Sequence, residues 1–133
     1  MIEKIEQQIK EILEKIKKET PIEALHNNNK YFILFSTIHY NLKKIYTEKK
    51  YQLDLLYNKL YKDLKYNSNY NLNTKKEIEI FIFENQNYLK LYRETLQLSN
   101  LINYIENLLD ILKSREYSLK NVINLQIEYP ENI

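Results

Sequence analysis

The segment "LSNLINYIENLLDILKSREYSLKNV", residues 98–122, has the strongest periodicity in the chain and decides its fold class. Its apolar residues are spaced by alternating steps of three and four, which is typical of a coiled-coil seam on an α-helix. The predicted seam consists of Leu98, Leu101, Ile105, Leu108, Leu112, Leu119 and Val122, with Arg115 as its one charged residue. The predicted oligomerisation residues are Leu98, Leu101, Ile105, Leu108, Leu112, Arg115 and Leu119. Ile102, Leu109 and Ile123 widen the seam beyond what one partner helix covers. We therefore predict a last helix over residues 88–127 that packs against two neighbours, in its own chain or in another.

Two further helical regions precede this segment. Isoleucines at helical spacing alternate with Glu and Lys from residue 2, which predicts an amphipathic helix to about Glu19 within an N-terminal region of residues 1–29. The sequence from Thr20 to Glu23 is a capping box with proline at the first helical position, which predicts the end of the first helix and the start of a short second one. Three asparagines at 27–29 follow as a loop or a cap. A central helix is expected over residues 30–66. Its apolar arc consists of Phe35, Ile38, Leu42, Ile45, Leu53, Leu56, Leu60 and Leu64.

Residues 67–87 connect the central and last helices and contain an ambiguous stretch, "EIEIFIF", at 77–83. Its alternation and β-branched residues favour an extended segment, whereas the sequence from Thr74 to Glu77 is typical of another helix start. We expect a short extended segment near 78–83. The predicted fold is all-α, a single domain over residues 1–133 with long central and C-terminal helices.

The composition excludes several classes of function. The 133-residue chain contains no glycine and no cysteine. Loops that hold phosphates and turns that expose a nucleophile require glycine, and thiolate metal sites and disulfides require cysteine. His26 and His39 lack the spacing of a metal site. We expect no enzyme activity and no cofactor. No apolar run reaches the length of a membrane span and no secretory signal is visible, so we expect a cytosolic protein.

The formal net charge is only +2, but positive charge is concentrated in residues 30–66, where eight lysines face three acidic residues. Lysine and tyrosine share the side of this helix that lies opposite the apolar arc. Cations for phosphates and flat rings for bases are the two components of single-strand binding. The alternative is an ordinary solvated face with half-buried tyrosines, or codon bias. The candidate DNA-binding residues are Lys43, Lys44, Lys50, Tyr51, Lys59, Tyr61, Lys62 and Lys65.

Arg115 is the one charged residue in the predicted seam and admits two interpretations. It could be a second DNA contact, or it could pair with Glu106, Asp110 or Glu116 across the oligomer seam. We favour the ion pair, because an arginine at a seam position normally pairs or reaches to the edge.

"TLQLSNLINYIENLLDILKSREYSLKNVINLQ", residues 95–126, resembles the C-terminal block of the UvsY-like recombination mediators of tailed phages. "EIEIFIFENQNYLK", residues 77–90, is similar to the family's segment before its last helix, and residues 42–69 resemble its central basic helix. The resemblance covers residues of about 28 to 127. The matching residues of the last block are Leu96, Gln97, Leu109, Asp110, Lys113, Ser114, Arg115, Tyr117, Lys120, Asn121 and Ile123.

The resemblance implies a non-enzymatic accessory of phage homologous recombination and repair in the cytoplasm of the infected bacterial host. Such proteins bind single-stranded DNA and help a RecA-like recombinase to replace the single-strand-binding protein. They assemble into a ring-shaped homo-oligomer, which implies a hexamer or heptamer here. The family's DNA-contacting positions fall on Lys62, and on Lys59 or Lys65. The alternative is an oligomeric coiled-coil adaptor that does not bind nucleic acid.

Overall fold

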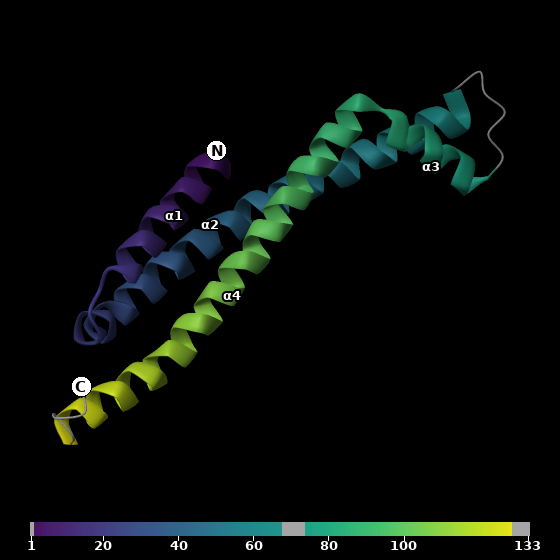
Figure 1. Ribbon diagram of the computed structural model, residues 1–133. Helices are drawn as coiled ribbons and strands as arrows, with labels where there is room; N and C mark the ends of the chain where they lie inside the picture. Colours follow the sequence, from purple (N-terminus) through teal and green to yellow (C-terminus); the bar gives the residue numbers. More distant parts are fainter. Residues whose placement is uncertain (1, 68–73, 129–133) are drawn as a thin grey trace. The chain divides into compact units, whose positions relative to one another are not determined.

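The computed structural model describes residues 2–67 and 74–128, and almost all of these residues are helical (Figure 1). The elements are α1 Ile2–Lys17, α2 Pro21–Lys62, the π-helical turn η1 Asp63–Asn67, α3 Lys75–Glu84 and α4 Gln86–Glu128. No strand occurs within these described ranges. The all-α prediction is therefore confirmed, and the predicted extended segment near 78–83 is wrong.

The boundary between α1 and α2 is set by the predicted capping box. The Glu23 amide donates to Thr20 Oγ1 at 3.3 Å, and the Thr20 amide donates to the Glu23 carboxylate at 3.4 Å. Pro21 occupies the first helical position, where its missing N–H costs no intrahelical hydrogen bond. The short turn at 18–20 thus reverses the chain between two helices.

The expected loop at the three asparagines is wrong, because α2 continues through residues 27–29 without a break. Two of these side chains instead make tertiary contacts. Asn27 Nδ2 donates to Glu19 Oε1 at 3.3 Å, and buried Asn28 donates to the carbonyl oxygen of Leu112 on α4 at 3.0 Å. Local preference for a turn is overridden here by hydrogen bonds to distant parts of the chain.

Residues 77–83 are helical because a cap and a helical burial pattern outweigh the alternation of apolar residues. The Glu77 amide donates to Thr74 Oγ1 at 3.2 Å, which fixes the start of α3. Ile78 and Ile82, four residues apart, are both buried, whereas Ile80 between them is exposed. A strand would place all three on one face, so the burial pattern has the helical period.

The described residues form two compact units. Unit 1 combines α1, residues 21–41 of α2 and residues 102–128 of α4. Besides the hydrogen bond from Asn28 to Leu112, further contacts join α2 to α4 within it: His39 Nε2 lies 2.9 Å from Glu106 Oε1, and the Lys113 ammonium lies 5.7 Å from the Phe32 ring centre. The buried apolar residues of this unit are Ile9, Ile12, Ala24, Tyr31, Phe35, Ile38, Ile102, Ile105, Leu108 and Leu112.

Unit 2 combines residues 42–62 of α2, η1, α3 and residues 86–101 of α4. Its core contains Leu53, Ile78, Ile82 and Tyr88, against which half-buried side chains of α2 and η1 pack. Lys49 on α2 pairs with Glu94 on α4 at 3.1 Å. Asn85 caps α4 by accepting the Tyr88 amide at 3.0 Å, so the chain turns between α3 and α4 over a single residue.

A polar cluster in unit 1 joins the α1–α2 turn to both longer helices. The Tyr31 hydroxyl donates to Glu19, and the Arg115 guanidinium lies 4.0 Å from the other oxygen of the same carboxylate. Burial and the hydrogen bond to Glu19 raise the pKa of Tyr31 to about 12. Glu19 is therefore held by residues from two helices.

The pKa of Tyr31 predicts a loss of stability at high pH. Tyr31 ionises near 10.0 when unfolded and about 12 when folded, so the unfolded chain releases its proton first. The free energy of unfolding should be unaffected by this group below about pH 10 and fall as the pH rises from there. Urea unfolding at about pH 9 and about pH 11 measures the loss, which Tyr31→Phe should reduce. An identical loss in that variant would contradict the assignment.

Among the described residues, no helix combines the length with the apolarity that crossing a bilayer requires.

Candidate nucleic-acid interface

The structure places all eight predicted DNA-binding residues in unit 2, seven of them on α2 and Lys65 in η1. All are exposed except Tyr61, which is half-buried. Lys50 pairs with Asp54 one turn along the helix at 3.3 Å, an exposed pair of small energetic value. The predicted residues thus belong to one unit, although they do not form a single face.

The α2 residues fall into two rows and one outlier. Lys44, Tyr51 and Lys62 follow one another at steps of seven and eleven residues, which an α-helix places on one face. Lys43, Lys50 and Tyr61 have the same spacing and form a second row, about 100° away from the first. Lys59 lies outside both rows, on the side away from Tyr61.

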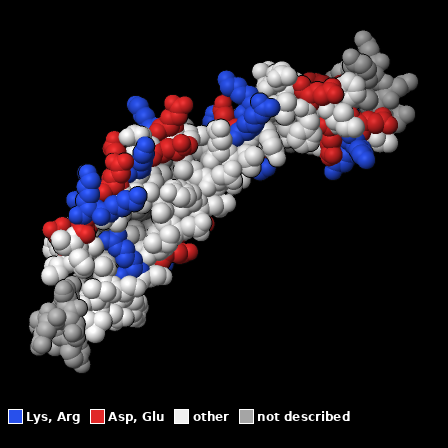
Figure 2. All heavy atoms as spheres, viewed as in Figure 1, with Lys and Arg blue, Asp and Glu red and all other residues white. Residues whose placement is uncertain are grey.

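Unit 2 also holds the chain's excess of positive charge. Residues 42–101 contain eleven Lys and Arg against seven Asp and Glu, a net charge of +4, whereas the remaining residues sum to −2. On the face shown in Figure 2, basic and acidic side chains alternate over α1, so local charges there largely cancel. A polyanion is therefore attracted to unit 2 rather than to unit 1.

Five aromatic rings from three helices meet in unit 2, and we call them the aromatic ladder: Tyr61, Tyr57, Tyr88, Tyr92 and Phe83. Tyr61 stacks on Tyr57 with ring centres 6.2 Å apart, Tyr57 lies 6.2 Å from Tyr88, and Tyr88 stacks on Tyr92 at 6.3 Å. Phe83 meets both Tyr88 and Tyr92 edge to face, at 5.5 and 6.0 Å. Both geometries are favourable arrangements for aromatic pairs.

Burial is the main cause that raises the pKa of the two inner phenols of the ladder, Tyr57 and Tyr88. Burial raises the pKa of Tyr57, and so does the hydrogen bond from its hydroxyl to Glu79 Oε1 at 3.0 Å. Burial also raises the pKa of Tyr88, although the nearby Lys50 ammonium lowers it in part. Neither ring acquires a negative charge that would repel phosphate at neutral pH.

At the Tyr61 end of the ladder, η1 brings in a cation. The Lys65 ammonium lies 5.8 Å from the centre of the Tyr61 ring and 5.4 Å from that of Tyr66. Both distances are within cation–π range. The prediction that α-helix continues to residue 66 is wrong for this turn, since residues 63–67 are π-helical. π-Helical turns are rare and are found frequently at functional sites.

Four ladder residues, Tyr57, Tyr88, Tyr92 and Phe83, are absent from the predicted site. Tyr57 and Tyr61 are four residues apart, and so are Tyr88 and Tyr92. Residues at this spacing are neighbours on one face of a helix, so the sequence alone could have predicted that each pair of rings lies side by side. Phe83 lies in the segment that was predicted to be extended, so its contacts with Tyr88 and Tyr92 of α4 could not be predicted from the sequence.

The predicted oligomerisation seam is occupied by contacts within the chain. Leu98, Leu101, Ile105, Leu108 and Leu112 are buried, and Leu119 is half-buried. The role of these residues in assembly stays a prediction. Val122, the last residue of the predicted seam, is 41% exposed, so its predicted burial is wrong within the chain. The other apolar α4 side chains that are left exposed in unit 1 lie outside the predicted seam, namely Tyr104, Ile111, Tyr117, Leu125 and Ile127.

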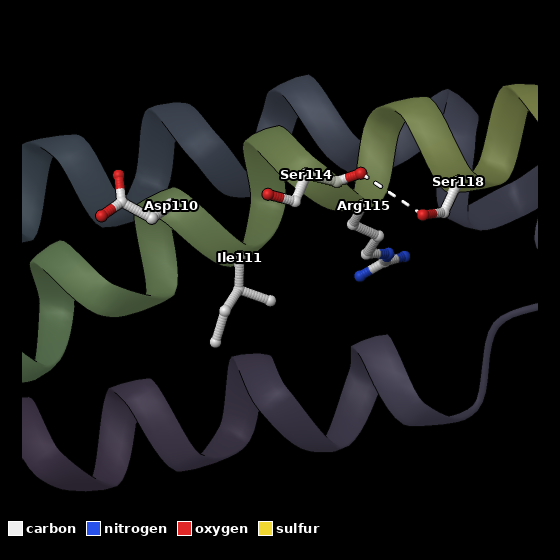
Figure 3. Close-up of a pocket in the computed structure, with 5 residues that line it drawn as sticks. All are labelled: Asp110, Ile111, Ser114, Arg115 and Ser118. Carbon is white, nitrogen blue, oxygen red and sulfur yellow. Dashed lines mark hydrogen bonds between the residues drawn. The ribbon is translucent and has the colours of Figure 1, made fainter.

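Arg115 has a partner that the sequence did not suggest. Within the chain its ion pair is with Glu19 of the α1–α2 turn, at 4.0 Å, whereas pairing with Glu106, Asp110 or Glu116 across an oligomer seam stays a prediction. Arg115 also lines an open groove on α4, together with Asp110, Ile111, Ser114 and Ser118 (Figure 3). Figure 3 shows Ile111 and Arg115 pointing from α4 toward α1. This groove lies in unit 1, whereas every predicted DNA-binding residue lies in unit 2.

The donor groups of the groove do not form a catalytic set. The Ser118 hydroxyl donates to the carbonyl oxygen of Ser114 at 3.5 Å, and no histidine lines the groove that could activate either hydroxyl. Among the described residues, no group of three or more His, Asp or Glu side chains could hold a metal ion.

Comparison of the chain with protein-family models, curated proteins and solved structures gave no match. The resemblance to the UvsY-like mediators therefore rests on the quoted residues alone.

Proposed function

We propose that this protein binds single-stranded DNA through unit 2 and acts as a recombination mediator. It would promote the loading of a RecA-like recombinase in place of the single-strand-binding protein during phage recombination and repair. The observation that carries the proposal is the coincidence, in one unit, of the positive charge excess with exposed lysines and aromatic rings. The mediator role itself, and its place in the cytoplasm of the infected host, are supported by the resemblance of residues 95–126 to the UvsY-like mediators.

The proposed mechanism depends on assembly. One protomer that uses about five lysines should show a log–log salt slope of roughly −3 to −4 on single strands, which corresponds to modest affinity at physiological salt. A ring-shaped homo-oligomer, hexameric or heptameric, would present several such surfaces to one strand and gain affinity through multivalency. Wrapping of the strand would then loosen the competing single-strand-binding protein.

The proposal is tested by fluorescence anisotropy of a labelled dT oligonucleotide and of a duplex of equal length, titrated at two salt concentrations. We expect tighter binding to the single strand, with affinity that falls steeply as salt rises. Bases in a duplex are not available for stacking, so the duplex should gain only the phosphate contacts. Equal binding to both, or none to either, would contradict the proposal.

The second candidate is an adaptor whose oligomeric helices contact protein only. It is favoured by the exposed apolar side chains that α4 carries in unit 1, such as Tyr104, Ile111 and Val122. Single exposed apolar residues are common on protein surfaces, whereas contiguous apolar patches mark sites of protein contact. The adaptor requires the exposed α4 residues to act together as such a patch. If the protein is an adaptor, analytical ultracentrifugation should show an oligomer. The anisotropy titration should then show no preference for the single strand over the duplex.

A further inference from the structure

The two ends of the aromatic ladder differ in how much ring surface they expose. At one end Tyr61 is half-buried and already lies beneath the Lys65 ammonium. In the middle, Tyr88 is only 5% exposed. At the other end, Phe83 and Tyr92 are 45% and 40% exposed. The Phe83–Tyr92 end therefore offers the most exposed ring surface of the ladder to a further flat group.

The exposed end is held in position by the rest of the ladder. Tyr92 stacks on buried Tyr88 at 24° between ring planes and meets Phe83 at 85°. Tyr88 in turn belongs to the core of unit 2 with Ile78 and Ile82. Because these contacts already restrict the rotamers, a ligand that stacks on Tyr92 or Phe83 loses little additional side-chain entropy.

The unit that carries this exposed end of the ladder has a net charge of +4. Arg93, which follows Tyr92 on α4, is exposed, and Lys50 on α2 belongs to the same unit, where it pairs with Asp54 at 3.3 Å. Leu96, one turn beyond Tyr92 on α4, is also exposed and extends the apolar surface. Flat apolar surface beside positive charge complements a base attached to a phosphodiester backbone.

We infer that Phe83 and Tyr92 form a stacking site for unpaired bases of single-stranded DNA, built from α3 and α4 rather than from the basic helix α2. The inference rests on the proposed function, because it concerns the same ligand. It assigns phosphate contacts to the α2 lysines and base contacts to the exposed end of the aromatic ladder. Every base has a flat π-face, so this site tolerates any sequence.

The test compares a dT oligonucleotide with an abasic oligonucleotide of the same length, which keeps the phosphates and lacks the bases. The wild-type chain should bind dT more tightly. The double variant Phe83→Leu, Tyr92→Leu keeps apolar, helix-forming side chains but no rings, and should bind dT at least about tenfold more weakly. Its affinity for the abasic strand should be unchanged. The matched control is Tyr104→Leu, Tyr117→Leu, which removes two exposed rings of α4 in unit 1 and should change neither affinity.

The outcomes separate this inference from the proposed function. A double variant that keeps the wild-type ratio of dT to abasic affinity would overturn the stacking site and leave single-strand binding intact. Wild-type protein that binds neither oligonucleotide would overturn both.

A second variant keeps the inference testable if the double variant is unstable. The chain contains no tryptophan, so Tyr92→Trp introduces a single indole at the site, which can be excited at wavelengths that the tyrosines do not absorb. A base that stacks on the indole should quench its emission when dT is added, whereas the abasic strand should not. Tyr104→Trp, in unit 1, should report no quenching with either strand. Unchanged emission from Tyr92→Trp under saturating dT would contradict the inference.

Discussion

Replacing Phe35 by alanine should lower the free energy of unfolding by about 3 to 5 kcal/mol, the largest stability effect that we expect from a single substitution. The Phe35 side chain is 0% exposed and lies on α2 in the core of unit 1. Truncation removes the buried ring and leaves a cavity that the surrounding helices can fill only in part. Urea denaturation followed by far-ultraviolet circular dichroism measures the change in the free energy of unfolding.

The control for this prediction lies two residues earlier on the same helix. Ile33 is 56% exposed, so Ile33→Ala removes little buried surface and adds a better helix former. Its free energy of unfolding should stay within about 0.5 kcal/mol of wild type. Similar losses for both variants would mean that the burial pattern of α2 in unit 1 is incorrect.

The largest functional effect should come from replacing Lys59, Lys62 and Lys65 together by alanine. All three are exposed at the C-terminal end of α2 and in η1. If each contacts one phosphate, the log–log salt slope on single strands should become shallower by about 2. Affinity for a dT oligonucleotide should fall on the order of 50-fold near 0.15 M salt. Anisotropy titrations of both proteins over a series of salt concentrations measure slope and affinity together.

A matched variant separates local contacts from a general change in charge. Lys4, Lys10 and Lys17 are also exposed, but they lie on α1 in unit 1. Replacing these three by alanine changes the net charge by the same amount and should alter the salt slope only slightly. Equal losses in the two variants would show that binding depends on total charge and not on the surface of unit 2.

Helical periodicity was sufficient to predict the long helices. The last helix was predicted over 88–127 and extends over Gln86–Glu128. A short helix was predicted from the Thr20 capping box and a separate central helix from residue 30, but α2 runs without a break from Pro21 to Lys62. The error arose at residues 27–29, where asparagine was given its usual turn preference. The contact of Asn28 with Leu112 joins residues that are far apart in sequence, and no local pattern encodes it.

The candidate site was predictable only where it lies on one helix. The lysines of α2 follow from sequence because their charge and spacing are local properties. The aromatic ladder requires α2, α3 and α4 to meet, and it could not be recognised while residues 78–83 were expected to be extended. Arg115 illustrates the same limit, since its partner Glu19 lies in the turn before α2.

The central claim is that single-stranded DNA lies on unit 2, and photo-crosslinking tests it most directly. A single strand that carries 5-iododeoxyuridine is bound to the full chain, irradiated and digested, and the crosslinked peptides are identified by mass spectrometry. We predict crosslinks within residues 42–101, at aromatic residues such as Tyr51 and Tyr92. Crosslinks confined to residues 2–41 and 102–128, or spread evenly along the chain, would contradict the claim.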